Sequence, residues 1–131
     1  MGKKSYTNGR KFEEELCDYF SSQGYYVIYN EKGITGAQPC DIVIIKNNIA
    51  ILVEAKNLDN KSGIFNLDRI EQNQVLAYNK FRSCKNTNFI LAIKWKNNIW
   101  LIDFGLLPYY QKSINLKQIE PNIKNWDKED K

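Results

Sequence analysis

The chain has 131 residues, 43% of them hydrophobic and 26% charged, and its formal net charge is +4. This length suits one domain with its own core. We expect neither a signal peptide nor a bilayer span, because no apolar run approaches the roughly 18 residues a span needs. The predicted location is therefore cytoplasmic, without membrane contact. The mildly basic charge suits either a nucleic-acid partner or an ordinary solubilising surface.

The residue types present limit the chemistry that is available. The chain has no histidine, which excludes His-based triads and His-ligated zinc. Its three cysteines are not paired in spacing and lack a CxxC motif, which indicates reduced thiols. Catalysis would therefore rely on carboxylates, lysine and a hard metal ion.

The first expected element is a helix over residues 8–22, after a short basic arm over residues 1–7. Asn8 suits the N-cap position, and the apolar residues that follow recur at helical spacing. Gly24 ends the pattern, and "YYVIY" predicts the first strand. A loop with the sequence "NEKGITGAQP" follows.

The tetrapeptide "KNNI" occurs twice, in "IIKNNIAILVE" and in "KWKNNIWLIDF". Each copy lies between apolar, β-prone runs. Asn-Asn tolerates the positive φ angles that a two-residue hairpin turn requires. We therefore expect two hairpins, one from residue 41 to 56 and one from about residue 88 to 104, with Asn-Asn as the turn in both.

The segment between the hairpins, "NLDRIEQNQVLAYNKF", predicts a second helix, with Asp68 and Glu71 in capping-box spacing. The periodic core ends near residue 110. Residues 111–131 are expected to form a partly flexible extension that ends in a solvated tail, "NWDKEDK". The order α-β-β-β-α-β-β predicts an α/β fold, in which one domain has a mixed β-sheet flanked by helices.

The first hairpin brings three charged side chains together. If Asn47 and Asn48 form the turn, Asp41 lies directly opposite Glu54, and Lys56 points to the same face. Two carboxylates at that separation repel each other unless a proton or cation lies between them. Magnesium suits the pair, because it prefers one or two carboxylates plus water and phosphate oxygens. A simple ion pair at the sheet end is the alternative.

One residue on each helix adds to this group. Glu13 projects about 100° round the helix from Phe12, so it borders the apolar stripe, either beside the site or in solvent. Gln74 lies within the stripe of the second helix, where a buried amide needs hydrogen-bond partners. It is either a structural hydrogen-bonder or a residue that reaches into the site. Gln72 should face solvent.

These motifs resemble the PD-(D/E)XK nuclease superfamily, with its restriction-endonuclease-like fold. "PCDIVI" and "VEAK" match its acidic residues and lysine, and "GRKFEEEL" is similar to the start of its first helix. Within the superfamily, "VEAKNLDNKSGIFNLDRIEQNQVLAYNKF" and "FGLLPYY" resemble the RecU-type Holliday-junction resolvases over residues 8–110. The segment "NEKGITGAQ" is shorter than the stalk of that family.

The resemblance implies an endonuclease that cuts branched DNA in recombination, with Mg²⁺ (or Mn²⁺ as a substitute) and no organic cofactor. Asp41 and Glu54 would bind the metal, and Glu13 would complete or support its shell. Lys56 would be the catalytic lysine, Gln74 an accessory residue of the active site, and Ser62, in the loop after "VEAK", a DNA contact.

Two further expectations concern partners. Basic residues beside the first helix would track DNA phosphates, namely Lys3, Lys4, Arg10 and Lys11. A homodimer would supply two active sites, through apolar residues of the second hairpin and the segment after it that otherwise belong to the monomer core: Trp95, Trp100, Leu101, Phe104, Leu106, Tyr109 and Tyr110. A restriction-like or mobile-element nuclease, and a non-catalytic DNA- or partner-binding protein, are the alternative functions.

Overall fold

A mixed β-sheet forms the centre of the computed structural model, which describes residues 2–30, 40–108 and 110–128, with side chains from residue 9 to 127. Its strand order is β1-β2-β3-β5-β6, and only β3 and β5 pair in parallel. The strands are β1 (Tyr26–Tyr29), β2 (Ile42–Lys46), β3 (Ile49–Asn57), β5 (Phe89–Trp95) and β6 (Asn98–Asp103). The expected α/β class, mixed sheet and element order are confirmed.

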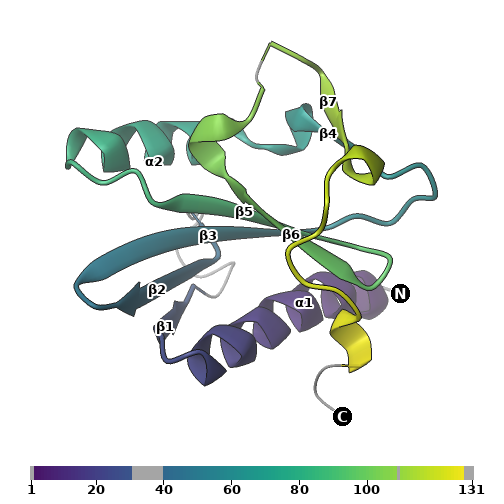
Figure 1. The fold of residues 1–131 in the computed structure, drawn as a ribbon, viewed down its shortest axis with the longest axis horizontal. Helices are drawn as coiled ribbons and strands as arrows, with labels where there is room; N and C mark the ends of the chain where they lie inside the picture. The colour runs from purple at the N-terminus through teal and green to yellow at the C-terminus, as the bar shows by residue number, and fades with distance from the viewer. Residues whose placement is uncertain (1, 31–39, 109, 129–131) are drawn as a thin grey trace.

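Helices cover both faces of this sheet. Figure 1 shows α1 (Gly2–Ser22) on one side and α2 (Gln72–Ser83) on the other. Short 3-10 helices follow several strands: η1 (Leu67–Arg69), η2 (Phe104–Leu106), η3 (Leu116–Gln118) and η4 (Trp126–Lys128). A small second sheet pairs β4 (Ile64–Asn66) with β7 (Ser113–Asn115). Sequence patterning missed this sheet, because three-residue strands that pair across such a distance carry no local periodicity.

The core has two parts, one on each face of the sheet. The α1 face buries a cluster made of Phe12, Leu16, Phe20, Ile42, Ile44, Val53, Ala55, Ala92, Ile99 and Trp126. The α2 face buries a larger cluster that includes Phe65, Phe89, Leu91, Ile93, Trp95, Trp100 and Phe104. Side chains alternate between the faces along each strand, so the parity of a strand residue decides which helix it meets.

Both helix starts differ from the sequence prediction. Helix α1 begins at Gly2, so Asn8 lies inside the helix and is not its N-cap. No proline interrupts this segment, and an interior Asn costs a helix less than about 1 kcal/mol. Helix α2 begins at Gln72, with Glu71 as its N-cap and Gln74 as the partner in the capping box. The predicted box of Asp68 with Glu71 is therefore wrong by one turn, because η1 occupies residues 67–69.

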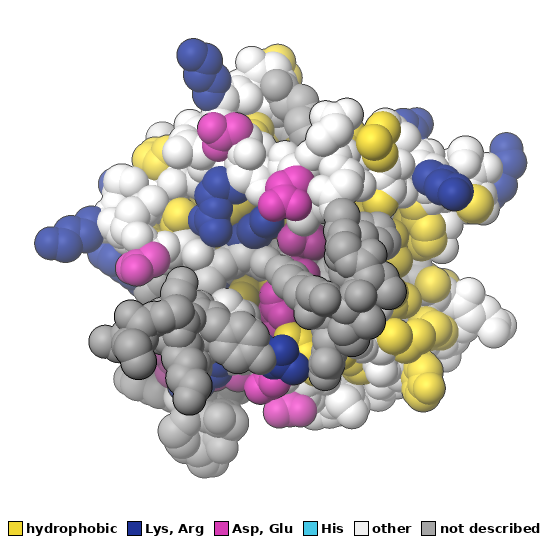
Figure 2. Space-filling view, turned by 180° about the vertical axis from the view of Figure 1, so that it is seen from behind, with side chains coloured by type: hydrophobic (Ala, Val, Ile, Leu, Met, Phe, Trp, Pro, Cys, Tyr) yellow, Lys and Arg dark blue, Asp and Glu magenta, His cyan; other side chains and the backbone are white. Residues whose placement is uncertain are grey.

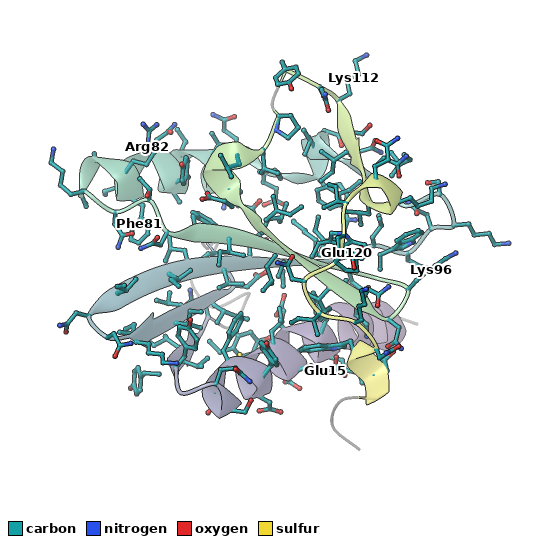
Figure 3. All side chains as sticks on the ribbon, in the orientation of Figure 1. Glu15, Phe81, Arg82, Lys96, Lys112 and Glu120 are labelled. Atoms are coloured by element: carbon teal, nitrogen blue, oxygen red, sulfur yellow. The ribbon has the colours of Figure 1, made fainter. Side chains whose placement is uncertain are left out.

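The expectation of a solvated C-terminal tail is wrong for Trp126, although its neighbours Asn125 and Asp127 are exposed. Trp126 is 7% exposed and packs on α1, with its ring centroid 5.4 Å from that of Tyr19 and 6.4 Å from that of Phe12. Its indole N–H donates to Glu15 Oε1 at 2.8 Å. Figure 3 shows Glu15 on α1 beside this last turn. The buried indole, more than the charged residues around it, decides where the segment lies.

Candidate active site

The β2–β3 hairpin has the register that its sequence predicts. Lys46 pairs with Ile49 and Ile42 with Val53, and the turn residues Asn47 and Asn48 have φ angles of 53° and 68°. Asparagine tolerates this left-handed conformation better than most residues. The same register sets Asp41, just before β2, opposite Glu54.

Asp41 is held by the backbone around it. Its Oδ2 accepts a hydrogen bond from the Ala55 amide at 2.9 Å, and its own amide donates to the Val53 carbonyl at 3.2 Å. The Asn30 amide, at the end of β1, donates to the Asp41 carbonyl at 2.8 Å. Three strands therefore meet at this residue, which is 2% exposed.

Glu54 and Lys56 lie on the α2 face of the sheet. Glu54 is 2% exposed, Lys56 is 14% exposed, and Lys56 Nζ lies 3.4 Å from Glu54 Oε2. In the parallel register these residues pair with Leu91 and Ile93, which belong to the α2-face cluster. Burial strengthens the attraction within such a charge pair and makes it costly to remove one partner. The ion pair therefore orients the lysine ammonium beside the carboxylate.

The donors at this sheet end suit a hard cation. Burial, and next the charges of Glu54 and Asp41, raise the pKa of Cys40 to about 12, so this neighbouring thiol stays protonated at neutral pH. A protonated thiol does not serve as a soft-metal ligand. The two carboxylates are instead the ligand set that Mg²⁺ prefers, with water and phosphate oxygens completing its coordination.

Glu13 is buried, which agrees with the alternative that placed it beside the site and not in solvent. It lies on α1, which packs on the other face of the sheet from α2. It is 6% exposed, and its Oε1 accepts a hydrogen bond from the Tyr29 hydroxyl at 2.6 Å. Within the described part of the chain, no three His, Cys, Asp or Glu side chains are grouped closely enough to hold a metal. Helix α1 packs on the opposite face of the sheet from Glu54, and the role of Glu13 in completing or supporting the metal shell stays a prediction.

Glu13 nevertheless lies in the same electrostatic neighbourhood as Asp41. The pKa of Cys17, one turn along α1 from Glu13, is raised to about 11. Burial is the largest cause, and the charges of Asp18, Glu13, Glu14 and Asp41 add to it. The carboxylates of α1 and of the hairpin therefore raise the pKa of the same thiol. Figure 2, the view from behind, shows Asp and Glu side chains along the middle of this face, with Lys and Arg side chains beside them.

Gln74 is buried on α2 at 4% exposure, and Gln72 is exposed, as expected. Gln74 Oε1 accepts a hydrogen bond from the Glu71 amide at 3.0 Å, which closes the capping box. This contact is the structural alternative that the sequence left open. A role for Gln74 in the active site stays a prediction.

Burial of polar groups coincides with the sequence-derived site. In the described part of the chain, the buried polar or charged side chains are Glu13, Asp41, Glu54 and Gln74. Burial of such groups is costly unless they are hydrogen-bonded, paired or bound to a metal. Glu13, Asp41 and Gln74 accept hydrogen bonds and Glu54 pairs with Lys56, so the structure compensates each burial with a polar contact.

The structure describes the side chains of some of the expected DNA contacts but not of others. The side chains of Lys3 and Lys4 lie outside the described residues, although their backbone belongs to α1. Lys11 is exposed, and Arg10 pairs with Glu14 at 3.1 Å. Ser62 is also exposed, and its Oγ accepts a hydrogen bond from the Ile64 amide at 3.2 Å.

The aromatic surface expected on the second hairpin is largely core. Trp95 and Trp100 are 7% and 2% exposed, because strand alternation points them into the α2-face cluster, and Phe104, at the start of η2, is 0% exposed in the same cluster. Leu106 and Tyr110 are exposed at 77% and 88%. Leu101 is partly buried, and Tyr109 lies outside the described residues.

Tyr29 is the residue of this site that sequence analysis missed. It lies at the end of β1, one residue before Asn30, and joins the α1-face cluster. Strand alternation in "YYVIY" sends Tyr25, Val27 and Tyr29 toward α1, which was the available signal. The pairing with Glu13 itself depends on the angle between α1 and β1, and no local pattern reports that angle.

The fold and the hairpin motif define a class of protein. A mixed sheet between two helices, with an acidic residue before β2 and Glu-x-Lys on β3, is the arrangement of a PD-(D/E)XK nuclease. The family model "Archaeal holliday junction resolvase (hjc)" matches residues 4–123. The chain therefore belongs to the archaeal Hjc family of Holliday junction resolvases. It is an endonuclease acting on branched DNA, and this confirms the predicted function.

The solved structures support the same fold. Hjc from Archaeoglobus fulgidus, an archaeal hyperthermophile, matches with a TM-score of 0.62 at 18% identity, and the match covers 82% of this chain and 86% of that one. The search of curated proteins gave no match. The closer likeness to RecU-type resolvases is not confirmed, since the matching family is the archaeal one. Members of that family generally use a divalent metal ion. Among the described residues, no helix has the length and apolar character needed to cross a membrane.

Proposed function

We propose that this chain is a Mg²⁺-dependent resolvase that cuts four-way DNA junctions, and that Asp41, Glu54 and Lys56 form its catalytic centre. The observation that carries the proposal is the burial of two carboxylates at the end of one hairpin, with a lysine ammonium 3.4 Å from one of them. Stability alone does not favour this arrangement, because like charges repel in a buried site. Mn²⁺ would be a substitute, and a cytoplasmic location stays a prediction.

Asp41 and Glu54 would hold the divalent ion through their carboxylate oxygens. When bound, the ion supplies Lewis-acid chemistry at a DNA phosphate. Lys56 provides a fixed positive charge at the same position, which stabilises the negative charge that builds up on the phosphate as water attacks phosphorus. The bond from phosphorus to the 3′ oxygen breaks, leaving a 5′-phosphate and a 3′-hydroxyl. Glu13 adds a negative charge from the α1 side, and Gln74 keeps α2 in position.

Binding of DNA would use the basic residues near α1. Arg10 and Lys11, with Lys3 and Lys4 nearer the N-terminus of α1, would contact phosphates, and Ser62 would contribute from the loop after β3. Each neutralised phosphate releases counterions, so the affinity should fall steeply with salt. Filter binding in Ca²⁺ at several salt concentrations measures this slope without cleavage.

A homodimer would supply the two active sites that paired cuts across a junction require. Leu106, Tyr110 and Ile119 are exposed apolar residues that line one hollow beside β6. Apolar and aromatic residues are enriched at the cores of such interfaces. Sedimentation at micromolar concentration, with and without junction DNA, tests this part. A monomer under both conditions would exclude paired incision and leave a nicking enzyme.

Cleavage assays on matched substrates test the whole proposal. Linear, flapped and four-way DNA of the same sequence should be compared in Mg²⁺, in Ca²⁺ and in EDTA. We expect cleavage of the four-way junction in Mg²⁺, binding with little turnover in Ca²⁺, and no cleavage in EDTA. Cleavage of linear DNA at the same rate would refute junction specificity, and cleavage in EDTA would refute the metal.

A further inference from the structure

Tyr29 makes two contacts to site residues that neither family membership nor the sequence motifs assign. Its hydroxyl donates to Glu13 Oε1 at 2.6 Å. Its ring lies under the guanidinium of Arg10, with Arg10 Cζ 5.7 Å from the ring centroid. One side chain therefore touches a buried carboxylate of the site and a cation expected to bind DNA.

We propose that Tyr29 is a positioning residue that fixes Glu13 through its hydroxyl and Arg10 through its ring, and so couples the metal side of the site to its DNA side. This inference rests on the proposed function for the roles of Glu13 and Arg10. Tyr29 itself touches neither metal nor substrate in this role.

The hydroxyl contact is suited to holding a carboxylate. Hydrogen bonds to an ionised acceptor are shorter and stronger than neutral ones. Burial, and next the hydrogen bond and charge of Glu13, raise the pKa of Tyr29 above its usual value, so the phenol remains a donor. With one oxygen held by the Tyr29 hydroxyl, the Glu13 carboxylate loses rotational freedom.

The ring contact acts on a residue that has a competing partner. Arg10 Nε donates to Glu14 Oε2 at 3.1 Å, and Glu14 is 57% exposed. An exposed pair of this kind is weak and screened by salt, so a phosphate can replace Glu14. A cation within about 6 Å of an aromatic centroid is attracted to the ring face. The ring therefore keeps the guanidinium beside β1 while its ion-pair partner changes.

Position along β1 explains why this residue can serve both groups. Tyr29 pairs with Ile42, the residue after Asp41, and the next residue, Asn30, donates its amide to the Asp41 carbonyl. Any shift of Tyr29 is therefore transmitted to the backbone of Asp41. The strand end holds Asp41 by its main chain and Glu13 by a side chain.

Two substitutions separate the two contacts. Tyr29→Phe removes the hydroxyl and keeps the ring, whereas Tyr29→Leu removes both. Tyr25→Phe and Tyr25→Leu are matched controls, because Tyr25 also lies on the α1 face under a cation, with Lys46 Nζ 5.0 Å from its ring centroid. Thermal melting of each variant checks that the fold is intact.

Two measurements test whether Tyr29 supports metal binding through Glu13. One is calorimetric titration of metal-free protein with Mg²⁺, and the other is the Mg²⁺ concentration that half-saturates junction cleavage. Loss of an outer hydrogen bond to a metal site typically costs 10- to 100-fold in affinity or activity. We expect Tyr29→Phe to raise both Mg²⁺ values about tenfold, with unchanged values for Tyr25→Phe. Wild-type values for Tyr29→Phe would overturn the Glu13 half of the proposal.

The salt dependence of junction binding in EDTA, where no cleavage occurs, tests whether Tyr29 supports DNA binding through Arg10. We expect Tyr29→Phe to keep the wild-type salt dependence. Tyr29→Leu and Arg10→Ala should each lower the slope of log K against log salt by about 1, and the double variant should lower it no further. An unchanged slope in Tyr29→Leu would overturn the Arg10 half. Failure of the wild-type protein to cleave in Mg²⁺ would instead refute the proposed function, while the binding arm would still test Arg10.

Discussion

The two hairpins carry the same tetrapeptide and use it differently. In the β2–β3 hairpin, Asn47 and Asn48 form the turn, with φ angles of 53° and 68°. In the β5–β6 hairpin, the turn shifts by one residue to Lys96 and Asn97, with φ angles of 48° and 70°. The expectation of an Asn-Asn turn in both hairpins is therefore wrong for the second.

Contacts with the C-terminal segment explain the shift. Asn97 accepts the Trp126 amide on its carbonyl at 2.7 Å and the Asp127 amide on its Oδ1 at 2.6 Å. Asn98 Oδ1 accepts the Asn125 amide at 3.3 Å. The first hairpin instead ends in exposed residues and carries its important side chains at the open end of its strands. The first hairpin therefore serves the proposed chemistry, and the second anchors the end of the chain.

The largest expected difference between the hairpins is catalytic. Lys56→Ala should lower junction cleavage by about 10²- to 10³-fold and leave junction binding near wild type, because it removes a positioned charge. Lys94, on β5 of the second hairpin, is the matched control, since it is 19% exposed against 14% for Lys56 and pairs with Asp127. Lys94→Ala should cleave at the wild-type rate. Equal losses in the two variants would mean that Lys56 has only a structural part.

A stability effect should belong to the C-terminal segment that the second hairpin anchors. Trp126→Ala removes a buried indole that packs on Phe12 and Tyr19 and bonds to Glu15. Truncation of a buried aromatic residue costs about 3 kcal/mol. Urea unfolding measures this loss, and the Mg²⁺ affinity of the folded protein should stay unchanged. A loss below about 1 kcal/mol would show that the Trp126 contacts contribute little and that the segment behaves as the solvated tail that its charged residues predict.

The metal should bind to the first hairpin alone. Asp41→Asn and Glu54→Gln should each weaken Mg²⁺ binding by at least about tenfold, which is the lower limit for losing even an outer contact of a metal site. In metal-free protein the melting temperature of Asp41→Asn should not fall, because the substitution removes a buried charge beside another carboxylate and keeps an oxygen that accepts the Ala55 amide. Calorimetric titration and thermal melting together measure this. Unchanged Mg²⁺ affinity in both variants would exclude the site.

The smallest effects should be of opposite sign at the two turns. Asn48→Gly should stabilise the protein by about 0.5 kcal/mol or less, because glycine adopts positive φ without steric cost and Asn-Gly suits this turn. Asn97→Gly should destabilise it by about 1 kcal/mol, because it removes the acceptor of the Asp127 amide. Chemical denaturation of the two variants in parallel measures the difference. Stabilisation by Asn97→Gly would show that the C-terminal contact contributes little.

Local sequence determined the centre of the site. A two-residue turn and the alternation of side chains along two strands suffice to set Asp41 opposite Glu54 with Lys56 on the same face, and the observed register agrees. Helical spacing likewise placed Gln74 within the apolar stripe of its helix, where it is buried, and Glu13 at the border of its stripe, where the sequence left burial open. These inferences hold because each depends on residues close in sequence, where backbone geometry leaves few alternatives.

Tertiary structure decided everything that joins distant segments. The approach of Glu13 from the α1 face and its bond to Tyr29, the pairing of β4 with β7, and the burial of Trp126 all depend on how separate elements pack. The shifted turn at Lys96 and Asn97 belongs with them, since the tetrapeptide itself allows both positions. A local pattern reports the period and face of one element. The angle and distance between two elements come from the packing of the whole core, so sequence analysis identified the residues that carry the charges of the site but not the contacts that hold them in position.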